Sequence, residues 1–472
     1  MRKNYAHQDH VFNRFKDAEY CGIFSETGTG KSRMGLQLLE NHYKEGRITA
    51  TLIITMSALT GVWAWDNLPD DSTIPYDIFL WKKSKQFPAP RRMLYFIINV
   101  DGVKVSDFRE AYRSFQRMHP KFALLIDEST IVKNGDAART KIIQLIADRA
   151  AIKIIMSGRS VVQGPLDLYS QANILKRELL GKSYYAFRGR YAIMKKQIIG
   201  NPHLDPDKPS KFKARAIQTV VGYQKMEELS DRIAEWAVVI KKADCLDLPD
   251  KIYKTVSVDL TKEQKRAYDD LLGRGVTYFK EHEITAVNSV ALLNRLLQIC
   301  AGQMKVENGY VTIPTEKTQA LLDLRERSGD DPIIVWSYFN EASRQAALAI
   351  GPKGLQVPSG LTPARLQAAL NSFRDASYST LIANQSSLGH GITLVNCSNT
   401  IYYSQSFNLE QRVQSEDRTH RIGQTNPCVY TDITVRGTVE GRVVKKLKEK
   451  LDLSDLILDK ARFLDFIHSK ED

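Results

Sequence analysis

Three short segments of the chain contain residue types that could do chemistry on a phosphate group. Gly28–Ser32, with the sequence GTGKS, joins a glycine turn to a lysine and a hydroxyl. Asp127 and Glu128 form an acidic pair, and Gln414–Gln424, with the sequence QSEDRTHRIGQ, contains two arginines. Cations and backbone amides can neutralise a phosphate, while a carboxylate can hold a metal ion or activate water. The combination indicates phosphoryl chemistry.

The glycine turn lies in the context that a phosphate loop requires. An apolar run at 22–24 precedes it and an amphipathic, leucine-rich stretch follows it, so we expect a strand, a turn and a helix. Glycines let backbone N–H groups converge on phosphate oxygens at a helix N-terminus, where Lys31 would neutralise phosphates and Ser32 would bind Mg²⁺. The alternative is a glycine turn with a surface lysine. Ser25 stands where the usual pattern has its first glycine.

The acidic pair follows a continuous apolar run, Phe122–Ile126, which is typical of a parallel strand buried on both faces. Carboxylates at the carboxyl end of such a strand lie where open α/β sheets bind ligands. Asp127 would hold Mg²⁺, directly or through water, and Glu128 would orient and deprotonate the attacking water. Alone, the pair could simply begin a loop. Together with the phosphate loop, it indicates a nucleotide hydrolase.

Charges as dense as those of Gln414–Gln424 usually form the solvated face of a helix. The distant phosphate loop and acidic pair favour another interpretation, in which Arg418 and Arg421 reach the γ-phosphate of ATP bound between two lobes. The sequence therefore predicts an ATP-hydrolysing motor.

The order of these segments resembles helicase superfamily II, and more closely its Swi/Snf-type ATPases, which translocate on double-stranded DNA. The resembling segments are Gln8, Glu26–Ser32 (motif I), Thr51–Leu59 with Trp63 (motif Ia), Leu124–Asn134 (motif II), Ile154–Gly158 (motif III), Leu388–Ile392 (motif V) and Gln414–Gln424 (motif VI). The last is the strongest match and sets the Swi/Snf branch apart.

The resemblance implies roles for individual residues, with ATP and Mg²⁺ as cofactors. The implied catalytic residues are Lys31, Glu128, Arg418 and Arg421. The implied nucleotide contacts are Gln8 (for adenine), Glu26, Thr27, Gly28, Thr29, Gly30, Lys31, Ser32, Gly391 and Gln414, and the implied metal ligands are Ser32 and Asp127. The implied nucleic-acid contacts are Ser57, Lys133, Asn134, Arg188, Arg190, Lys195, Lys196, Ser337 and Ser387.

Two segments depart from the family pattern. Ser157–Ser160 replaces the usual Thr-Gly-Thr-Pro-like turn of motif III, which is thought to link nucleotide state to lobe movement. In motif II, Ser129 and Thr130 replace an alanine and a histidine. Neither change affects the charged residues above, so we expect hydrolysis to survive both.

Composition is that of an intracellular globular protein. The 472 residues are 43% hydrophobic, enough for two or three domains with cores. Five scattered cysteines without a CxxC pair argue against a zinc site or a disulfide framework. The N-terminus lacks the apolar stretch of a signal peptide and no long apolar run occurs, so we expect no membrane association. We expect a cytoplasmic protein of a bacterium or phage-infected cell, or a nuclear one in a eukaryote.

The net charge of +13 suits a polyanionic partner. Much of it lies between Lys176 and Arg215, where eleven basic residues face three acidic ones and four aromatic residues are interleaved. The resembling family has a helical protrusion at about this place. We expect this segment to contact the DNA backbone, although it could be a merely solvated basic face.

The chain is expected to be α/β, with two RecA-like parallel-sheet lobes in tandem and helical insertions. Lobe 1 spans 1–246 with a basic helical insertion at about 165–235. Lobe 2 spans 247–472 with a helical part at about 262–304, and 439–458 is expected to form a closing helical brace. Apolar runs at 332–336, 379–384 and 400–403 alternate with helical patterns at 340–350 and 362–373, which predicts a parallel sheet.

The expected function is an ATP-dependent double-stranded DNA translocase that remodels protein–DNA complexes or branched DNA. Its binding would be independent of sequence, because the implied contacts go to phosphates. Other replication or repair proteins could be partners. Two alternatives stay open, a strand-separating DNA or RNA helicase and an ATP-gated binding subunit with slow hydrolysis.

Overall fold

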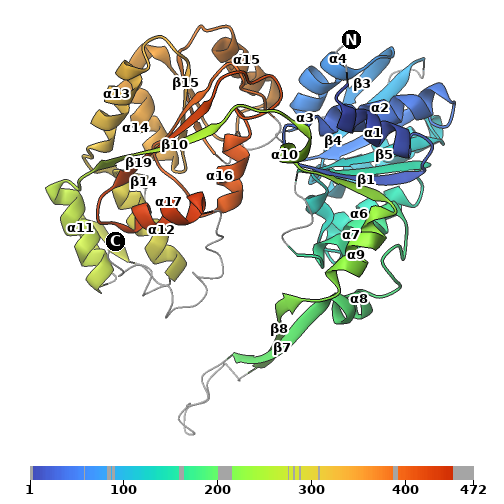
Figure 1. Ribbon diagram of the computed structural model, residues 1–472, viewed down its shortest axis with the longest axis horizontal. Coiled ribbons are helices and arrows are strands. Elements are labelled where there is room, and N and C mark those ends of the chain that lie inside the picture. Colours follow the sequence, from blue (N-terminus) through green and yellow to red (C-terminus); the bar gives the residue numbers. More distant parts are fainter. Residues whose placement is uncertain are drawn as a thin grey trace. The chain divides into compact units, whose positions relative to one another are not determined.

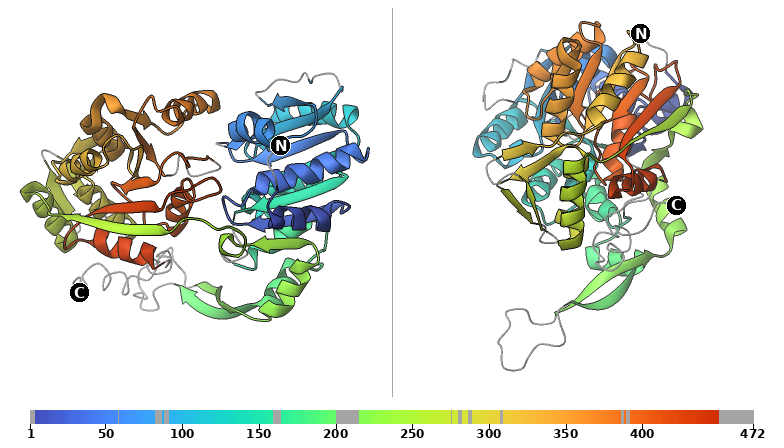
Figure 2. Two further views of the ribbon diagram at one scale, coloured as in Figure 1. Left: turned by 45° about the horizontal axis from the view of Figure 1, so that its top comes forward. Right: turned by 90° about the vertical axis from the view of Figure 1, so that its left-hand side faces the viewer.

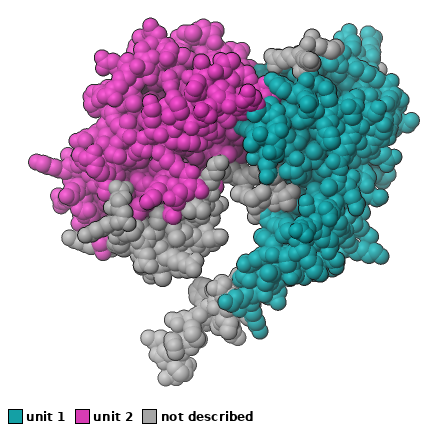
Figure 3. Space-filling model, in the orientation of Figure 1, with its two compact units in different colours: residues 1–246 teal, residues 247–472 magenta. Residues whose placement is uncertain are grey.

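The structure is a computed structural model (Figure 1, with further views in Figure 2). It describes residues 4–57, 59–81, 87, 91–158, 164–199, 215–274, 276–279, 282–285, 289–306, 309–385, 388 and 392–449. The chain divides into two compact units, Met1–Leu246 and Asp247–Asp472, which Figure 3 colours teal and magenta.

The core of unit 1 is a seven-stranded sheet in which every pairing is parallel. Its strands are β1 (Tyr20–Ser25), β2 (Ala50–Thr55), β3 (Tyr76–Leu80), β4 (Met93–Asn99), β5 (Phe122–Asp127), β6 (Ile152–Ser157) and β9 (Ala237–Ile240). Their spatial order is β3-β4-β2-β5-β6-β1-β9. Because all strands run the same way, their carboxyl ends meet at one edge. The order places the ends of β5, β6 and β1 side by side.

Helices cover both faces of this sheet (Figure 1). Outside the basic insertion, the helices of unit 1 are α1 (Ala6–Phe15), α2 (Lys31–Lys44), α3 (Leu59–Val62), α4 (Leu68–Asp71), α5 (Ser106–Met118), α6 (Ala138–Ala147) and the short α10 (Lys242–Cys245), with a π-helix η1 (Trp63–Asn67) and 3-10 turns η2 (Gly102–Lys104) and η3 (Ser129–Val132). Burial on both faces explains why β2 and β5 are entirely apolar or threonine apart from the final aspartate of β5.

The basic insertion is only partly helical, so the prediction for 165–235 was wrong at its centre. It contains α7 (Asp167–Leu175), α8 (Tyr184–Tyr191), β7 (Ala192–Ile199), β8 (Arg215–Tyr223) and α9 (Met226–Ala234). β7 and β8 form an antiparallel hairpin that extends from α8 and α9 away from the sheet of unit 1 (Figure 1). The strands AIMKKQII and RAIQTVVGY are rich in β-branched residues, which favour extended backbone over helix.

Unit 2 contains a second sheet in which every pairing is parallel. Its strands are β10 (Lys251–Val258), β15 (Ile333–Ser337), β16 (Gly354–Val357), β17 (Thr380–Asn384), β18 (Asn399–Tyr402) and β19 (Cys428–Val435). Their order is β10-β19-β18-β15-β17-β16. Two parallel sheets with helices, one in each unit, confirm the predicted α/β class with two RecA-like lobes.

The helices of unit 2 are α11 (Lys262–Arg274), α12 (Ser289–Cys300), α13 (Lys317–Arg327), α14 (Asn340–Ile350), α15 (Pro363–Arg374), α16 (Leu409–Glu416) and α17 (Val439–Lys448), with a 3-10 turn η4 (Gly351–Lys353). The predicted helical part at 262–304 also contains strands. The hairpin of β11 (Val276–Phe279) and β12 (His282–Thr285) separates α11 from α12, and a second hairpin of β13 (Gln303–Val306) and β14 (Gly309–Thr312) follows. The predicted brace begins as α17, and 450–458 lie outside the described residues.

A buried ion pair joins three elements of unit 2. The Lys317 Nζ atom of α13 lies 2.5 Å from the Glu440 carboxylate of α17, and both side chains are almost fully buried. Lys317 also donates hydrogen bonds to the backbone carbonyls of Tyr403 and Ile433, while the second carboxylate oxygen accepts from the Val435 N–H. Both charges are therefore paired and hydrogen-bonded, as burial requires.

In the part of the chain that the structure describes, no helix combines the length and the apolar character needed to cross a membrane.

We expect Lys317→Met to destabilise unit 2 by about 3–5 kcal/mol, because it leaves the Glu440 carboxylate buried without its partner. Urea denaturation followed by tryptophan fluorescence measures the change. Lys446→Met is the matched control: its ion pair with Glu449 is exposed, so the loss should stay below about 1 kcal/mol. Equal losses in the two variants would contradict this account of the buried pair.

Candidate functional site

The glycine turn after β1 has the backbone of an anion-binding loop. Gly28 and Gly30 have φ angles of +94° and +87°, a region that L side chains rarely adopt, and α2 begins at Lys31. The buried Thr29 hydroxyl donates to the Glu26 carbonyl at 2.8 Å, which closes the turn. The loop therefore fits a phosphate, because it leads directly into the N-terminus of α2, whose first residue is Lys31.

Gln8 supports this loop from α1. Its side chain is 2% exposed, its Nε2 atom donates to the Thr29 carbonyl at 3.3 Å, and its Oε1 atom accepts from the Tyr5 N–H. A Cβ atom at Gly30 would collide with the same Nε2 atom, so a side chain is excluded there. The side-chain oxygen and nitrogen of Gln8 thus each have one hydrogen-bond partner within unit 1. The second N–H of the Nε2 group could donate to adenine.

The acidic pair and the phosphate loop meet at the end of β6. The Lys31 Nζ atom lies 3.8 Å from the Glu128 carboxylate, and the Gly158 N–H donates to the same carboxylate at 3.3 Å. A Cβ atom at Gly158 would lie 2.8 Å from Thr27 Oγ1 and 3.0 Å from Lys31 Nζ. The three sequence motifs therefore touch one another, and the last residue of motif III has to be small.

Asp127 is a buried carboxylate beside a second carboxylate. Burial, and then the charge of Glu128, raise its pKa to about 6, although Lys31 and a hydrogen bond from Trp63 act in the opposite direction. The Trp63 indole N–H donates to Asp127 Oδ2 at 2.8 Å. The protein alone therefore does not fully stabilise the ionised form of Asp127. A bound cation would supply the missing stabilisation, so this carboxylate suits a metal ligand.

Glu128 has a left-handed backbone, with φ 56° and ψ 61°. This conformation is unfavourable for a residue with a side chain, by roughly 1–3 kcal/mol. It turns the chain sharply after β5, so that the two acidic side chains approach Lys31 from the same strand end. Such strain collects at functional sites, where the surrounding structure maintains it.

The π-helix η1 contributes two contacts that the sequence analysis missed. Besides the Trp63 bond to Asp127, the Asn67 amide donates to the Ser32 hydroxyl at 3.2 Å. The proposed metal ligands, one from each motif, are thus oriented by the two ends of η1. A π-helix turn at a functional site is common. Its i to i+5 hydrogen bonds cannot be recognised from hydrophobic periodicity, so the sequence analysis identified Trp63 with motif Ia but not Asn67.

The arginines of motif VI follow α16 in unit 2. Arg418 is 1% exposed, and its guanidinium donates to the backbone carbonyls of Gln414 and Ile392. Arg421, which is partly exposed, donates to the same Ile392 carbonyl at 3.3 Å. Both arginines are therefore hydrogen-bonded to the last residue of motif V. Gly391 lies outside the described residues.

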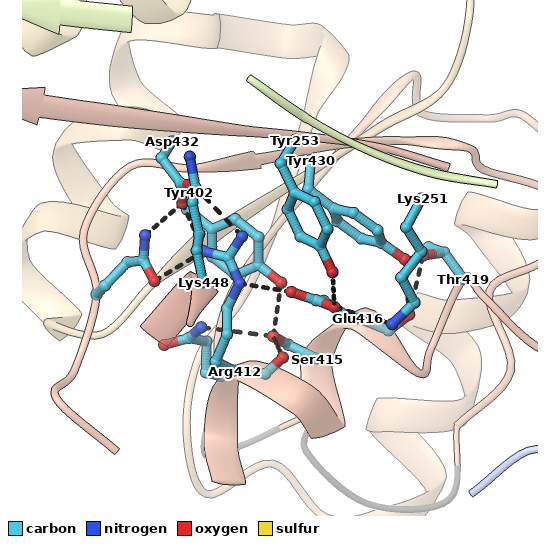
Figure 4. A network of polar contacts seen from close by, with 12 residues as sticks. Lys251, Tyr253, Tyr402, Arg412, Ser415, Glu416, Thr419, Tyr430, Asp432 and Lys448 are labelled. Carbon is cyan, nitrogen blue, oxygen red and sulfur yellow. Dashed lines mark hydrogen bonds and ion pairs between the residues drawn. The ribbon is translucent and has the colours of Figure 1, made fainter. Parts of the chain in front are cut away.

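A buried polar network holds α16 on the sheet of unit 2 (Figure 4). The guanidinium of Arg412 stacks on the Tyr402 ring with 3.6 Å to its centroid and bridges Asp432 at 2.5 Å and Glu416 at 2.8 Å. Lys448 adds a second cation 3.1 Å from Asp432. Charges of both signs alternate through the cluster. Because these contacts are directional, they fix the position of α16 on the sheet.

The same helix is bonded to the start of unit 2. Lys251 and Tyr253 of β10 contact the Glu416 carboxylate at 2.9 and 2.8 Å, and the His420 ring is 2.8 Å from the Pro249 carbonyl. Burial alone would raise the pKa of Glu416, but Lys251 and Arg412 outweigh it and lower that pKa. The first residues of unit 2 are therefore attached to the arginine motif, a contact that no sequence pattern predicted.

The predicted nucleic-acid contacts outside the insertion differ in exposure. Ser57 is exposed after β2, and Lys133 and Asn134 line an open groove of 620 Å³ in unit 1. Ser337 is fully buried and its hydroxyl is bonded to Ser404 and the Phe339 carbonyl, so its side chain cannot face a ligand from this position. Ser387 lies outside the described residues.

The four predicted nucleic-acid contacts in the insertion also differ in their exposure and in their partners. Lys195 and Lys196 are exposed on β7, and Arg188 lies over the Tyr185 ring at 5.2 Å. Arg190 makes two 2.7 Å hydrogen bonds to the Glu228 carboxylate, which supplies it with a structural role.

We expect Asp127→Asn to stabilise unit 1 at pH 7.5, without nucleotide or metal, by about 1–3 kcal/mol. The pKa of Asp127 is raised from 3.8 to about 6. Above pH 6 the native aspartate is charged at a cost that the unfolded chain does not bear. Between pH 6 and 4 the native state takes up a proton first, so the gain should shrink as the pH falls.

Urea denaturation at pH 7.5 and pH 5 measures this difference. Asp148→Asn is the control, because a hydrogen bond from Arg177 lowers the pKa of Asp148 and the substitution should therefore not stabilise the protein. An Asp127→Asn variant that is less stable than the parent at pH 7.5 would refute the account.

Comparison with known proteins places this site in a family. Residues 11–307 match the SNF2-related domain, and residues 316–423 match the helicase conserved C-terminal domain. Protein p41 of Acyrthosiphon pisum secondary endosymbiont phage 1 is 22% identical, over 96% of this chain and 97% of its own length. A Caenorhabditis elegans homologue of the SWI/SNF-related regulator of chromatin subfamily A-like protein 1 is 23% identical over 91% of this chain.

The chain spans 58% of the length of that worm protein and 12% of CHROMATIN REMODELING 4 of Arabidopsis thaliana. Among solved structures, the SWI2/SNF2 ATPase core of Sulfolobus solfataricus in complex with dsDNA aligns with a TM-score of 0.44 and 17% identity, covering 100% of this chain and 98% of that one. Because the SNF2-related domain spans more than half of its length, the chain belongs to the SNF2-related family and is an ATPase of helicase superfamily II.

Proposed function

We propose that this chain is an ATP-driven translocase on double-stranded DNA that remodels protein–DNA complexes or branched DNA. The observation that carries the hydrolytic part is the convergence of Lys31, Glu128 and Gly158 beside the buried Asp127. Membership of the SNF2-related family supports DNA as the track. The phage relative supports the cytoplasm of a bacterium or an infected cell as the compartment.

Within unit 1 each residue has a defined task in hydrolysis of the substrate ATP. The glycine loop and Lys31 bind the phosphates, and Gln8 supports the loop and faces adenine with its remaining N–H. Glu128 orients the attacking water and accepts its proton. The Gly158 N–H and Lys31 hold the Glu128 carboxylate in place for this step.

The residues at the end of β5 fit Mg²⁺. A hydroxyl and a carboxylate, from Ser32 and Asp127, are hard oxygen donors of the kind this ion prefers. No group of three or more His, Cys, Asp or Glu side chains in the described ranges could hold a metal ion alone, so phosphates and water would complete its shell. When bound, the ion supplies positive charge that stabilises the transferring phosphoryl group.

Unit 2 supplies the arginines. We propose Arg421 as the residue that meets the γ-phosphate, because it is partly exposed, and Arg418 as the residue that fixes the backbone at the end of motif V. Arginines supplied in this way accelerate other nucleotide hydrolases by about 10³–10⁵. Repeated closing and opening of the two lobes would couple hydrolysis to movement along DNA.

DNA contacts are proposed at the exposed Lys195 and Lys196 and at the partly exposed Arg188. Contacts to phosphates neutralise the backbone without reading bases, so binding should be independent of sequence and should weaken as salt rises.

The decisive experiment measures steady-state ATP hydrolysis with no nucleic acid, single-stranded DNA, duplex DNA, forked DNA and RNA. We expect the largest stimulation by duplex or forked DNA, and loss of at least about 100-fold in Glu128→Gln and Arg421→Ala. Arg436→Ala is the matched control, since this exposed arginine pairs with exposed Asp259 and with the backbone carbonyl of Ser257, away from the arginine motif. Equal rates with every nucleic acid would rule out the translocase.

A second prediction concerns Gly158→Ala. The added methyl group would press on Thr27 and Lys31 and push the Glu128 carboxylate from its N–H donor, so hydrolysis should fall at least about tenfold with little loss of stability. Gly189→Ala is the control, since nothing lies within 4 Å of a Cβ at that exposed site in α8. Wild-type rates in Gly158→Ala would show that the contact is irrelevant to hydrolysis.

A further inference from the structure

The β7–β8 hairpin exposes apolar side chains at its root, where it leaves α8 and α9. The residues concerned are Ile193 (46% exposed), Val221 (56%) and Tyr223 (41%) of the two strands, together with Tyr185 (73%) of the adjoining helix α8. We call these four residues the hairpin root. Seven of the eighteen exposed large hydrophobic residues in the described part of the chain lie between 184 and 226. Their concentration in one short insertion requires an explanation.

The exposed apolar side chains that the strands contribute to the hairpin root lie on both faces of the two-stranded ribbon. Ala192 pairs with Tyr223, and the next residue, Ile193, pairs with Gly222, so Tyr223 and Ile193 lie on opposite faces. Both are more than 40% exposed. A register shift follows between Ile193 and Met194, where Val221 is the extra residue on β8. Uncovered apolar surface therefore lies on both faces of the ribbon.

Cationic residues continue from the hairpin root along the ribbon. Lys195 and Lys196 follow on β7, where they are exposed, and Arg188 lies over the Tyr185 ring. The two strands together contain three cationic residues and no acidic residue. An anionic partner with flat apolar surfaces matches this composition, and nucleic acid with exposed base faces has both properties.

Base faces are accessible only where stacking is interrupted. In the interior of a linear duplex, neighbouring bases cover one another, and only edges and phosphates remain. At a fork or junction the last base pair and the unpaired bases present their faces, which apolar and aromatic side chains can cover. The hairpin root would therefore gain binding energy at a branch and none on plain duplex, whereas the lysines would serve both.

We propose that the hairpin root is a branch-point platform, on which the terminal base pair or unpaired bases of branched DNA pack while Lys195 and Lys196 hold the adjoining backbone. This inference rests on the proposed function and assigns a substrate class, branched DNA, to it.

The test compares binding of a fork and of a linear duplex of equal length by fluorescence anisotropy, without nucleotide. The outer ends of both DNAs are closed by non-nucleotide linkers, so that only the fork exposes base faces, and 2-aminopurine stands at its branch point. The variant is Ile193→Ser with Val221→Ser, both at exposed positions. The matched control is Leu348→Ser, because Leu348 is 67% exposed on α14 of unit 2. The parent should prefer the fork and raise the 2-aminopurine fluorescence.

We expect the double variant to lose about tenfold in affinity for the fork and to lose the fluorescence change, with linear-duplex affinity unchanged. Lys195→Gln with Lys196→Gln should instead weaken binding to both DNAs and lower the salt dependence by about one unit per lysine. A fork preference that survives in the double variant, or an equal loss on both DNAs, overturns the platform and points to a protein partner for the hairpin root. Equal rates of hydrolysis by the parent with every nucleic acid would instead overturn the proposed function, so the two failures are distinguishable.

Discussion

Two negative charges have to stand side by side at the end of a buried strand in unit 1, and the surrounding structure is organised around them. Asp127 and Glu128 repel each other, and burial of Asp127 makes this worse. Lys31 and the Gly158 N–H hold Glu128, while the Trp63 indole holds Asp127. These partners come from two loops and η1, so holding both carboxylates requires the ends of β1, β5 and β6 to be neighbours.

Unit 2 handles its charges differently. Arg412, Asp432 and Glu416 form a buried network in which charges of both signs are paired, and Lys251 extends it to the segment that leads into the unit. Unit 1 thus keeps a carboxylate that is incompletely stabilised, whereas unit 2 provides a rigid base for its arginine motif. This contrast agrees with a division of labour in which one unit binds a cation and phosphates and the other supplies a fixed positive charge.

The sequence was sufficient for features that depend on local pattern. Glycines followed by Lys31, and the apolar run before Asp127, predicted a loop and a strand that the structure contains. The sequence was insufficient where the position of a residue depends on which strands are neighbours in the sheet. The role of Gly158 follows from the adjacency of β6 to β1 and β5, and that of Asn67 from a π-helix. The basic insertion was expected to be helical because the resembling family has a helical protrusion at this place, and the β-branched pattern of the two strands was given no weight.

The pairing of β10 with β19 has a consequence for how the protein is made. Eight residues of the first strand of unit 2 pair with eight that lie about 177 positions later. During synthesis, β10 leaves the ribosome early and stays an unpaired edge until residue 435 has emerged, whereas every strand of the unit 1 sheet is complete by residue 240. Unit 1 can therefore finish folding alone, while unit 2 closes in one late step. Chaperone protection or a translational pause would matter most in that interval.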